Sequence, residues 1–194
     1  ELSDGPVRLI TSCGCNPEVD IVWQAAVRRT GAHSTLSIGG RDSASFVLRD
    51  ETGLLAPTGP EGISAKRLEE ANEIWLDAQH GGYKSSHGLL HRRRLFMSGD
   101  GTRSTGEDSL VRPVSRGQSD DRRFINFEIR FHLHPGVTAL MGADYIRLSP
   151  DGGPSWRFKT SHTGARLERT IYLARGSVER SGQIVLSGQA DTNS

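Results

Sequence analysis

Two arginines followed by a histidine are the first residues in this chain whose types and spacing could do chemistry. Residues 28–33 read RRTGAH, so small residues lead from Arg28 and Arg29 to His33, at the start of an expected strand. A histidine on such a rigid edge can bind a metal ion or contact a sugar acid. The structural alternative is a ring that caps neighbouring backbone groups, and the residues alone favour that alternative.

A second basic cluster, HRRR at residues 91–94, lies inside another expected strand. Strand alternation places Arg92 and Arg94 on one face and His91 on the other, so neither face is a simple solvent face. Rows of arginine on a sheet suit carboxylates and sulfates, which they bind through paired hydrogen bonds. The alternative is that they pair with acidic side chains on a neighbouring strand, such as Glu107 and Asp108. The sequence leaves both interpretations open.

Two further histidines stand two residues apart in the segment FHLHPG, residues 131–136. His132 and His134 could hold one metal ion, as in the His-x-His signature of cupins. That signature needs a glutamate a few residues later, and this chain has Val137, Thr138 and Ala139 there. A metal site of that kind would lack ligands. We therefore expect the two rings to belong to a polar stripe that faces solvent or an interface.

Other reactive motifs are missing from the sequence. It contains no glycine-rich phosphate loop, no nucleophile elbow and no zinc-like cysteine spacing. Cys13 and Cys15 are too close for an unstrained disulfide, so two free thiols are expected and the redox compartment stays open. Aromatic side chains can stack on sugar rings, but each of these is more often part of a core: Trp23, Trp75, Tyr83 and Trp156.

The elements that must position these residues are short strands. Alternating runs broken by Gly, Asp and Pro predict antiparallel strands, at residues 7–12, 34–38, 43–48, 74–79, 89–98, 125–134, 166–174 and 183–187. Residues 20–29 alone look helical. Asp100-Gly101 predicts a tight hairpin after residue 98. The fold class expected is an all-β antiparallel sandwich of two stacked sheets, with residues 1–194 as a single domain.

The strand at residues 125–134 has the clearest alternation in the chain. Its odd-numbered face, from Phe127 to Leu133, is apolar, and its even-numbered face carries Glu128, Arg130 and the two histidines. At the chain start, residues 1–3 resemble a strand end that turns back through Asp4-Gly5. This start predicts a fragment of a longer protein.

Composition excludes some partners. With 24 basic and 23 acidic residues, the formal charge of +1 argues against a dedicated nucleic-acid-binding protein. No stretch approaches the roughly 18 apolar residues of a membrane span.

Several segments, taken in order, resemble the C-terminal region of heparinase II/III-like proteins. They are RLITSCG (8–14), AHSTL (32–36), GY (82–83), GLLHRRRL (88–95), GED (106–108), FHLHPGV (131–137) and WRF (156–158). Each is weak singly, but the ordered set extends from about residue 6 to the end of the chain and is fairly specific.

The resemblance implies a bacterial polysaccharide lyase, periplasmic or cytoplasmic, with an α-helical toroid upstream of the β-sandwich. Such lyases act by β-elimination on uronic-acid polymers such as glycosaminoglycans, and their catalytic Tyr and Asn or His lie on the toroid. The resemblance therefore implies no catalytic residue in this chain. It implies an acidic polysaccharide as partner and a substrate-facing surface at His33, Arg28 and Arg29. His91, Arg92 and Arg94 are second candidates for substrate binding.

The resemblance also bears on a metal. His33 matches the histidine of an Ala-His-Asn-Thr-like motif, which is a metal ligand or a cleft residue in several members, and the resemblance implies a divalent metal such as zinc in the full-length family. The asparagine that follows it is Ser34 here, and the aspartate that many members use as a second ligand aligns with Ser12. These departures predict no cofactor in this chain. A non-catalytic carbohydrate-binding or structural module is the alternative function.

Overall fold

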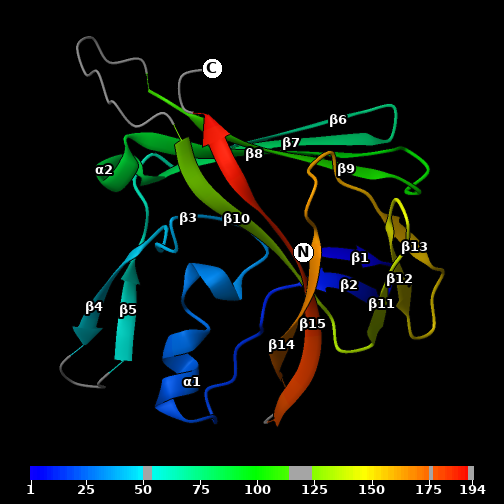
Figure 1. Ribbon diagram of the computed structural model, residues 1–194, viewed down its shortest axis with the longest axis horizontal. Helices are drawn as coiled ribbons and strands as arrows, with labels where there is room; N and C mark the ends of the chain where they lie inside the picture. Colours follow the sequence, from blue (N-terminus) through cyan, green and yellow to red (C-terminus); the bar gives the residue numbers. More distant parts are fainter. Residues whose placement is uncertain (50–53, 114–123, 175–176, 192–194) are drawn as a thin grey trace. The chain divides into compact units, whose positions relative to one another are not determined.

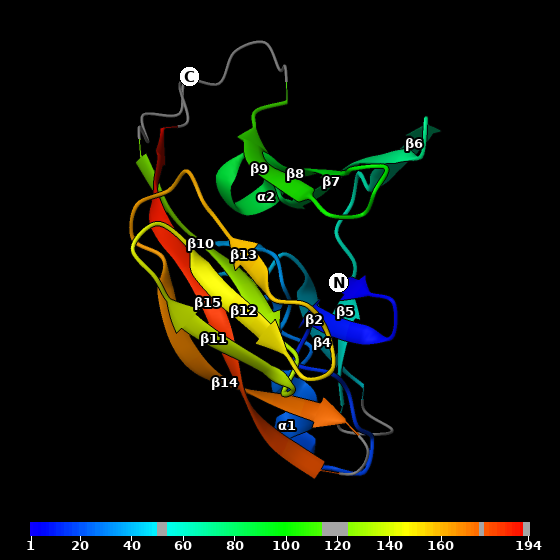
Figure 2. The same ribbon diagram turned by 90° about the vertical axis from the view of Figure 1, so that its right-hand side faces the viewer.

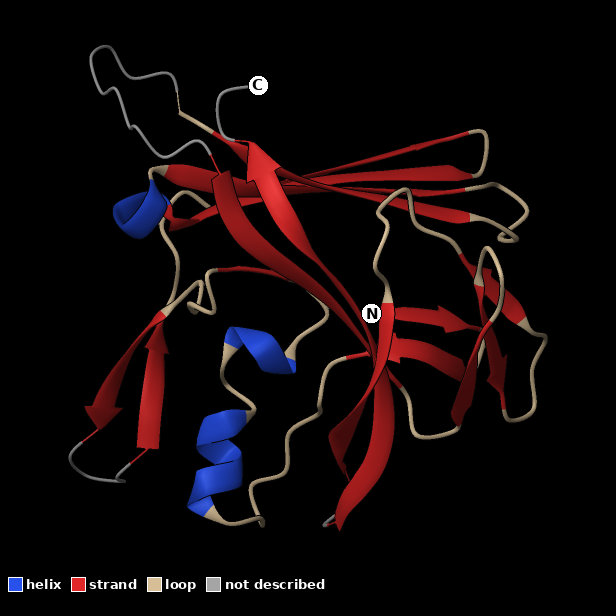
Figure 3. Cartoon of the chain, in the orientation of Figure 1, coloured by secondary structure: helices blue, strands red, loops and turns tan. Residues whose placement is uncertain are grey.

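The computed structural model describes residues 1–49, 54–113, 124–174 and 177–191. Within these residues strands dominate and helices are few and short, as the alternating pattern predicts (Figure 3). The contacts divide the chain into two compact units. Unit 1 holds residues 1–42, 48–56 and 126–188, and unit 2 holds residues 43–47, 57–125 and 189–194.

The main sheet of unit 1 has six strands. They are β1 (Leu2–Asp4), β2 (Val7–Thr11), β10 (Phe124–Leu133), β15 (Ser177–Asp191) and β14 (Arg166–Ala174) in spatial order, with β3 (Leu36–Ile38) also pairing with β10 (Figure 1). β1 and β2 are antiparallel, and Gly5 in the turn between them has a φ of +55°. The expected turn at Asp4-Gly5 is confirmed.

A smaller sheet of unit 1 stacks on this main sheet (Figure 2). It consists of β11 (Val137–Met141), β12 (Ile146–Pro150) and β13 (Trp156–Phe158), all antiparallel. Apolar side chains from both sheets form one buried cluster: Leu9, Leu133, Val137, Ile146, Leu148, Ile184 and Leu186. Phe131, on the odd-numbered face of β10, packs against this cluster and stacks edge-on against Phe158. The expected sandwich of two stacked sheets is confirmed.

The opposite face of the main sheet is covered by the segment that follows β2. The helix α1 (Ile21–Ala26) begins after Asp20, whose carboxylate accepts a 2.7 Å hydrogen bond from the Val22 backbone N–H. The short 3-10 helix η1 (Thr30–Ala32) follows it. Cys13, Val27 and Leu173 form the buried contact between this segment and the sheet. Cys13 is buried, Cys15 is exposed, and both are free, as expected.

Unit 2 contains a four-stranded antiparallel sheet. Its strands follow chain order: β6 (Ser64–Glu70), β7 (Glu73–Tyr83), β8 (Leu89–Met97) and β9 (Ser104–Val111). The predicted hairpin at Asp100-Gly101 joins β8 to β9, and Gly101 has a φ of +70°. The short helix α2 (Lys84–His87) connects β7 to β8. Two further strands, β4 (Ser45–Arg49) and β5 (Leu54–Thr58), pair with each other.

Among the described residues, no helix is long and apolar enough to cross a membrane.

Candidate functional site

A polar groove in unit 1 is the best candidate for a binding site. It has a volume of about 380 Å³ and lies beside β3 and β10. The side chains that line it are Arg29, Ser37, Arg41, Asp42, Glu128 and Arg130. β10 contributes Glu128 and Arg130 because its even-numbered residues share one face.

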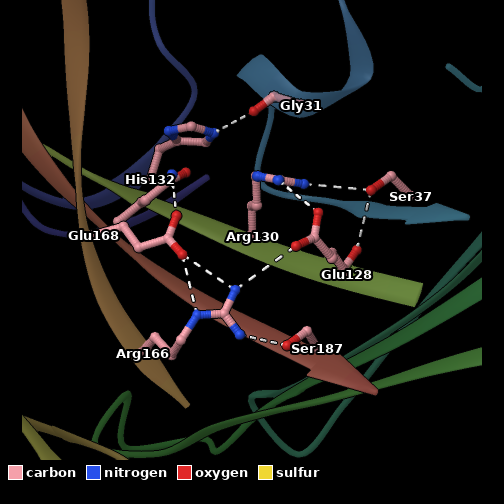
Figure 4. Close-up of polar contacts among 9 residues, drawn as sticks. Gly31, Ser37, Glu128, Arg130, His132, Arg166, Glu168 and Ser187 are labelled. Atoms are coloured by element: carbon pink, nitrogen blue, oxygen red, sulfur yellow. Dashed lines mark hydrogen bonds and ion pairs between the residues drawn. The ribbon is translucent and has the colours of Figure 1, made fainter. Parts of the chain in front are cut away.

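The polar face of β10 forms an ordered ladder of ion pairs (Figure 4). Arg130 donates a 2.6 Å hydrogen bond to the Glu128 carboxylate and a 3.3 Å bond to the Ser37 hydroxyl on β3. Arg166, on β14, lies 3.7 Å from the other Glu128 oxygen and 3.1 Å from Glu168. These contacts hold the wall of the groove in a fixed arrangement.

The groove carries a surplus of positive charge. Arg29 pairs with Asp42 at 2.6 Å, and Arg130 pairs with Glu128 at the same distance. Arg41 is exposed, and its guanidinium makes no ion pair or hydrogen bond with any described residue. Three arginines therefore face two carboxylates, and Arg41 keeps its full donor capacity. Such a site suits a carboxylate or sulfate, which an arginine can bind through two parallel hydrogen bonds.

The prediction that His132 belongs to an exposed polar stripe is wrong. Its ring is only 2% exposed because η1 lies over this part of β10. Nε2 donates a 2.9 Å hydrogen bond to the Gly31 carbonyl, while Nδ1 faces the Cys13 thiol at 3.4 Å and the Thr170 hydroxyl at 3.3 Å. Burial lowers the pKa of His132 to about 4, so the ring is neutral at pH 7.

His132 and His134 do not converge on one point. His134 lies beyond the end of β10 and packs edge-on against Tyr172, with ring centroids 5.3 Å apart. Within the ranges that the structure describes, no group of three or more His, Cys, Asp or Glu side chains could hold a metal ion.

His33 stands at the exposed end of η1 and does not line the groove. Its Nδ1 lies 3.2 Å from the Ser12 hydroxyl, so the two residues aligned with metal ligands of the resembling family are in contact. Partial burial of the ring lowers the pKa of His33. Arg29 lines the groove, whereas Arg28 donates to the backbone carbonyl of Gln24.

The second predicted cluster lies in unit 2, on β8. The alternation is confirmed: Arg92 and Arg94 both contact Asp77 on β7, whereas His91 turns to the other face and contacts Asp108 on β9. Arg94 also lies 3.8 Å from Glu107. The interpretation in which these arginines pair with acidic residues of neighbouring strands is therefore correct. Their predicted role in substrate binding stays a prediction.

His91 is part of a buried chain of hydrogen bonds. The Gly82 backbone N–H donates to Nδ1 of His80, which requires the His80 proton to lie on Nε2. That nitrogen contacts Nδ1 of His91 at 3.1 Å, and Nε2 of His91 then donates to Asp108 at 2.6 Å. Arg93 closes the chain with bonds of 2.8 and 2.9 Å to the same carboxylate. The Gly82 backbone N–H therefore fixes which ring nitrogen carries the proton in both His80 and His91.

The four aromatic candidates take different positions. Tyr83 is fully buried, and Trp156 packs against the core of the sandwich. Trp23 and Trp75 are exposed, at 40% and 50%, and Trp75 packs on Phe96 with ring centroids 4.4 Å apart.

Sequence reasoning missed Arg41 and Arg166 as members of the groove and its ladder. Arg41 directly follows the Gly39-Gly40 break after the expected strand at 34–38. That break is the one local feature of the sequence that could have pointed to Arg41 as a site residue. Arg166 begins an expected strand and carries no signal that connects it to Glu128.

The protein family described as "Heparinase II/III-like, C-terminal" matches residues 1–194 of the chain. The chain is also 31% identical over 191 residues to "FtsZ-localized protein C" of Caulobacter vibrioides (strain NA1000 / CB15N). That alignment covers 94% of this chain and 32% of the relative, so the chain spans about a third of the relative's length. No solved structure matches the chain.

Proposed function

Because this chain belongs to the heparinase II/III-like C-terminal family, we propose that it is the β-sandwich part of a lyase that acts on a uronic-acid polysaccharide. The observation that carries the proposal is the groove beside β10, where Arg41 faces solvent without a described partner. In this role the sandwich binds the acidic polymer, and the bond-breaking residues lie on another part of the protein.

The chemistry of such a lyase explains why a cationic groove is useful. In β-elimination a base removes the C5 proton of the uronic acid, a double bond forms between C4 and C5, and the glycosidic oxygen leaves C4 with a proton. The polymer carries a carboxylate on each uronic acid. Arg29, Arg41 and Arg130 pair with carboxylates on sugars that flank the cleaved bond, and so hold the polymer in place.

Arg41 provides the sharpest test of this role. Arg41→Gln removes a cation that has no ion-pair partner among the described residues, so affinity for a tetragalacturonate probe should fall about fivefold to tenfold. Arg147→Gln is the matched control, since Arg147 is an exposed arginine of unit 1 outside the groove. Binding is measured by calorimetry at low and at 0.15 M salt, and screening should weaken it at the higher salt.

If the Arg41→Gln and Arg147→Gln proteins bind tetragalacturonate with equal affinity, the groove is not the binding site for the acidic polymer. The lyase activity itself is tested on the intact protein with a panel of uronic-acid polymers, by following the absorbance of the unsaturated product.

A second candidate function is a non-catalytic carbohydrate-binding or structural module. It is supported by the relative, whose name, "FtsZ-localized protein C", describes a location and no lyase activity. The two functions differ in one measurable result. A module binds the polymer through the groove, but the intact protein then releases no unsaturated oligosaccharide from any polymer of the panel.

A zinc ion does not fit the described residues at His33. A hydroxyl, that of Ser12, occupies the place of the family's carboxylate ligand and hydrogen-bonds to the ring. A neutral hydroxyl and one imidazole are a weak ligand pair. We therefore assign no step of the proposed function to a metal.

A further inference from the structure

A second and larger pocket lies in unit 1, with a volume of about 710 Å³. It lies where β2, the end of β10, the end of β12 and the β14–β15 pair meet. The polar side chains that line it are Arg8, His134, Asp151, Tyr172 and Glu179. We call it the Arg8 pocket. It shares no lining residue with the groove beside β10.

The polar groups of this pocket are positioned by contacts with one another. Arg8 donates a 3.1 Å hydrogen bond to the Tyr172 hydroxyl, and the Tyr172 ring, buried at 7% exposure, packs edge-on against His134. The Gly136 backbone N–H lies 3.3 Å from Nδ1 of His134. That contact makes Nδ1 an acceptor, so the ring proton lies on Nε2.

Several of these groups keep unused hydrogen-bonding capacity. Nε2–H of His134 and the carboxylate of Asp151 make no hydrogen bond with any described residue. Arg8 uses one of its five N–H groups, and the Tyr172 hydroxyl, which accepts from Arg8, still has its own proton to donate. Donors and acceptors therefore face the same space from four elements, next to apolar surface from Pro6 and Pro150.

The charge of the pocket decides what kind of ligand it suits. One cation, Arg8, faces two carboxylates, Asp151 and Glu179, so an anionic ligand meets net repulsion. A ligand rich in hydroxyl groups can donate to the carboxylates and accept from Arg8, Tyr172 and His134 without burying a charge of its own. An apolar wall beside such polar groups suits the C–H face of a sugar ring.

We propose that the Arg8 pocket binds a neutral sugar residue. The proposal goes beyond the function assigned to the groove, because it concerns a different pocket and a different class of sugar. A protein with both sites engages a polymer, or two polymers, through acidic and neutral sugars at separate places on one sandwich.

The test compares tetrasaccharides of one length and three charge classes. The neutral probes are β-1,4-linked glucose and N-acetylglucosamine tetrasaccharides, the anionic probe is tetragalacturonate, and the cationic probe is a glucosamine tetrasaccharide. Binding to the intact protein is followed by saturation-transfer NMR and by titration. Asp151→Asn keeps the shape of the side chain but removes its charge, so it should weaken binding of a neutral probe about tenfold. Arg8→Lys should weaken it as well.

Glu18→Gln is the matched control, because Glu18 is an exposed carboxylate of unit 1 outside the pocket, and it should leave binding of the neutral probe unchanged. Arg41→Gln should leave it unchanged too. The proposal is overturned if neither neutral probe binds, or if neutral binding is insensitive to Asp151→Asn. It is equally overturned if the protein binds the cationic probe more tightly than either neutral probe and Asp151→Asn abolishes that preference. Loss of tetragalacturonate binding in Arg41→Gln alone reports on the groove and not on this pocket.

Discussion

Two aspartates of the four-stranded sheet make the same kind of contact at very different depths. Asp108 bonds to His91 and Arg93 with its side chain 8% exposed, whereas Asp77 bonds to Arg92 with its side chain 38% exposed. Burial raises the pKa of Asp108, but the hydrogen bonds from His91 and Arg93 outweigh it and leave that pKa below its usual range. A comparison of Asp108 with Asp77 therefore separates the effect of burial on stability from the effect of ion pairing.

Asp108→Asn should destabilise unit 2 by about 3 kcal/mol, because it removes the charge of a buried carboxylate that accepts hydrogen bonds from His91 and Arg93. Asp77→Asn should change the stability of the sheet far less, since water already screens that pair. Hydrogen exchange of β7 and β8 amides in the two variants measures the difference. A comparable loss of protection in both variants would show that the burial of Asp108 does not determine how much its charge stabilises the sheet.

His132 gives the stability of unit 1 a dependence on pH. Its pKa is about 4 in the folded chain, mainly because the ring is buried, and about 6.5 in an unfolded chain. Between these two values the unfolded chain binds more protons, so stability falls as pH drops from about 6.5 to 4. At pH 5 the loss relative to pH 7 is about 2 kcal/mol from this residue.

The measurement is urea unfolding of the protein at pH 7 and pH 5, followed by a probe in unit 1. His132→Gln cannot take up the proton, so its stability should change less between the two pH values than that of the parent protein. An identical pH dependence in the parent and the variant would assign the effect to other groups.

At the level of elements, β10 is covered on both faces near its C-terminal end. Leu133, 1% exposed, packs into the sandwich core, and His132, 2% exposed, lies under η1. Leu133→Ala should cost about 2–5 kcal/mol through the cavity that it leaves. His132→Ala should cost a comparable amount, because it leaves a cavity and removes the partner of the Gly31 carbonyl.

Thr138→Ala, an exposed position on β11, is the control and should stay within about 0.5 kcal/mol. Chemical denaturation of the three variants compares them. A strand with one solvated face would show a large cost at Leu133 and almost none at His132.

The same strand shows what sequence could and could not predict. Alternation from Phe127 to Leu133 correctly assigned the apolar face, because a strand repeats every two residues whatever its surroundings. Alternation carries no information about what covers the other face. Gly31, which lies over His132, is 101 residues away in sequence, and no local pattern connects the two.

The candidate groove was predictable only in part for a related reason. Arg29 was found because it stands in a local cluster with Arg28 and His33. Arg41 and Arg130 are brought together with it by the pairing of β3 with β10, in which Leu36 pairs with Ile129. Register between distant strands is set by the whole fold, so the groove itself could not be deduced from spacing.

At the level of the whole molecule, the proposed function gives this chain a binding role. The groove beside β10 and the Arg8 pocket, both in unit 1, are lined mainly by arginines and carboxylates, and the buried hydrogen-bond chain of unit 2 is closed by the Asp108–Arg93 pair. The proposed division of labour therefore assigns binding to this chain and elimination to residues elsewhere in the protein.

This division predicts that the purified 194-residue chain releases no unsaturated oligosaccharide from any uronic-acid polymer, while it still binds tetragalacturonate. Binding persists because the groove is formed entirely by residues of unit 1. Elimination is not expected because, in the proposed division, the base that removes the C5 proton and the acid that protonates the leaving oxygen lie elsewhere in the protein. The measurement is ultraviolet absorbance of the product over a panel of polymers, with the intact protein assayed in parallel.

Circular dichroism of the 194-residue chain controls for folding, so that a misfolded sample is not mistaken for an inactive one. Product formation by this chain alone would place a catalytic base within it. The Arg8 pocket would then be the first place to look, because Tyr172 and His134 lie there side by side, and Tyr172→Phe in the same assay would identify or exclude the tyrosine as that base.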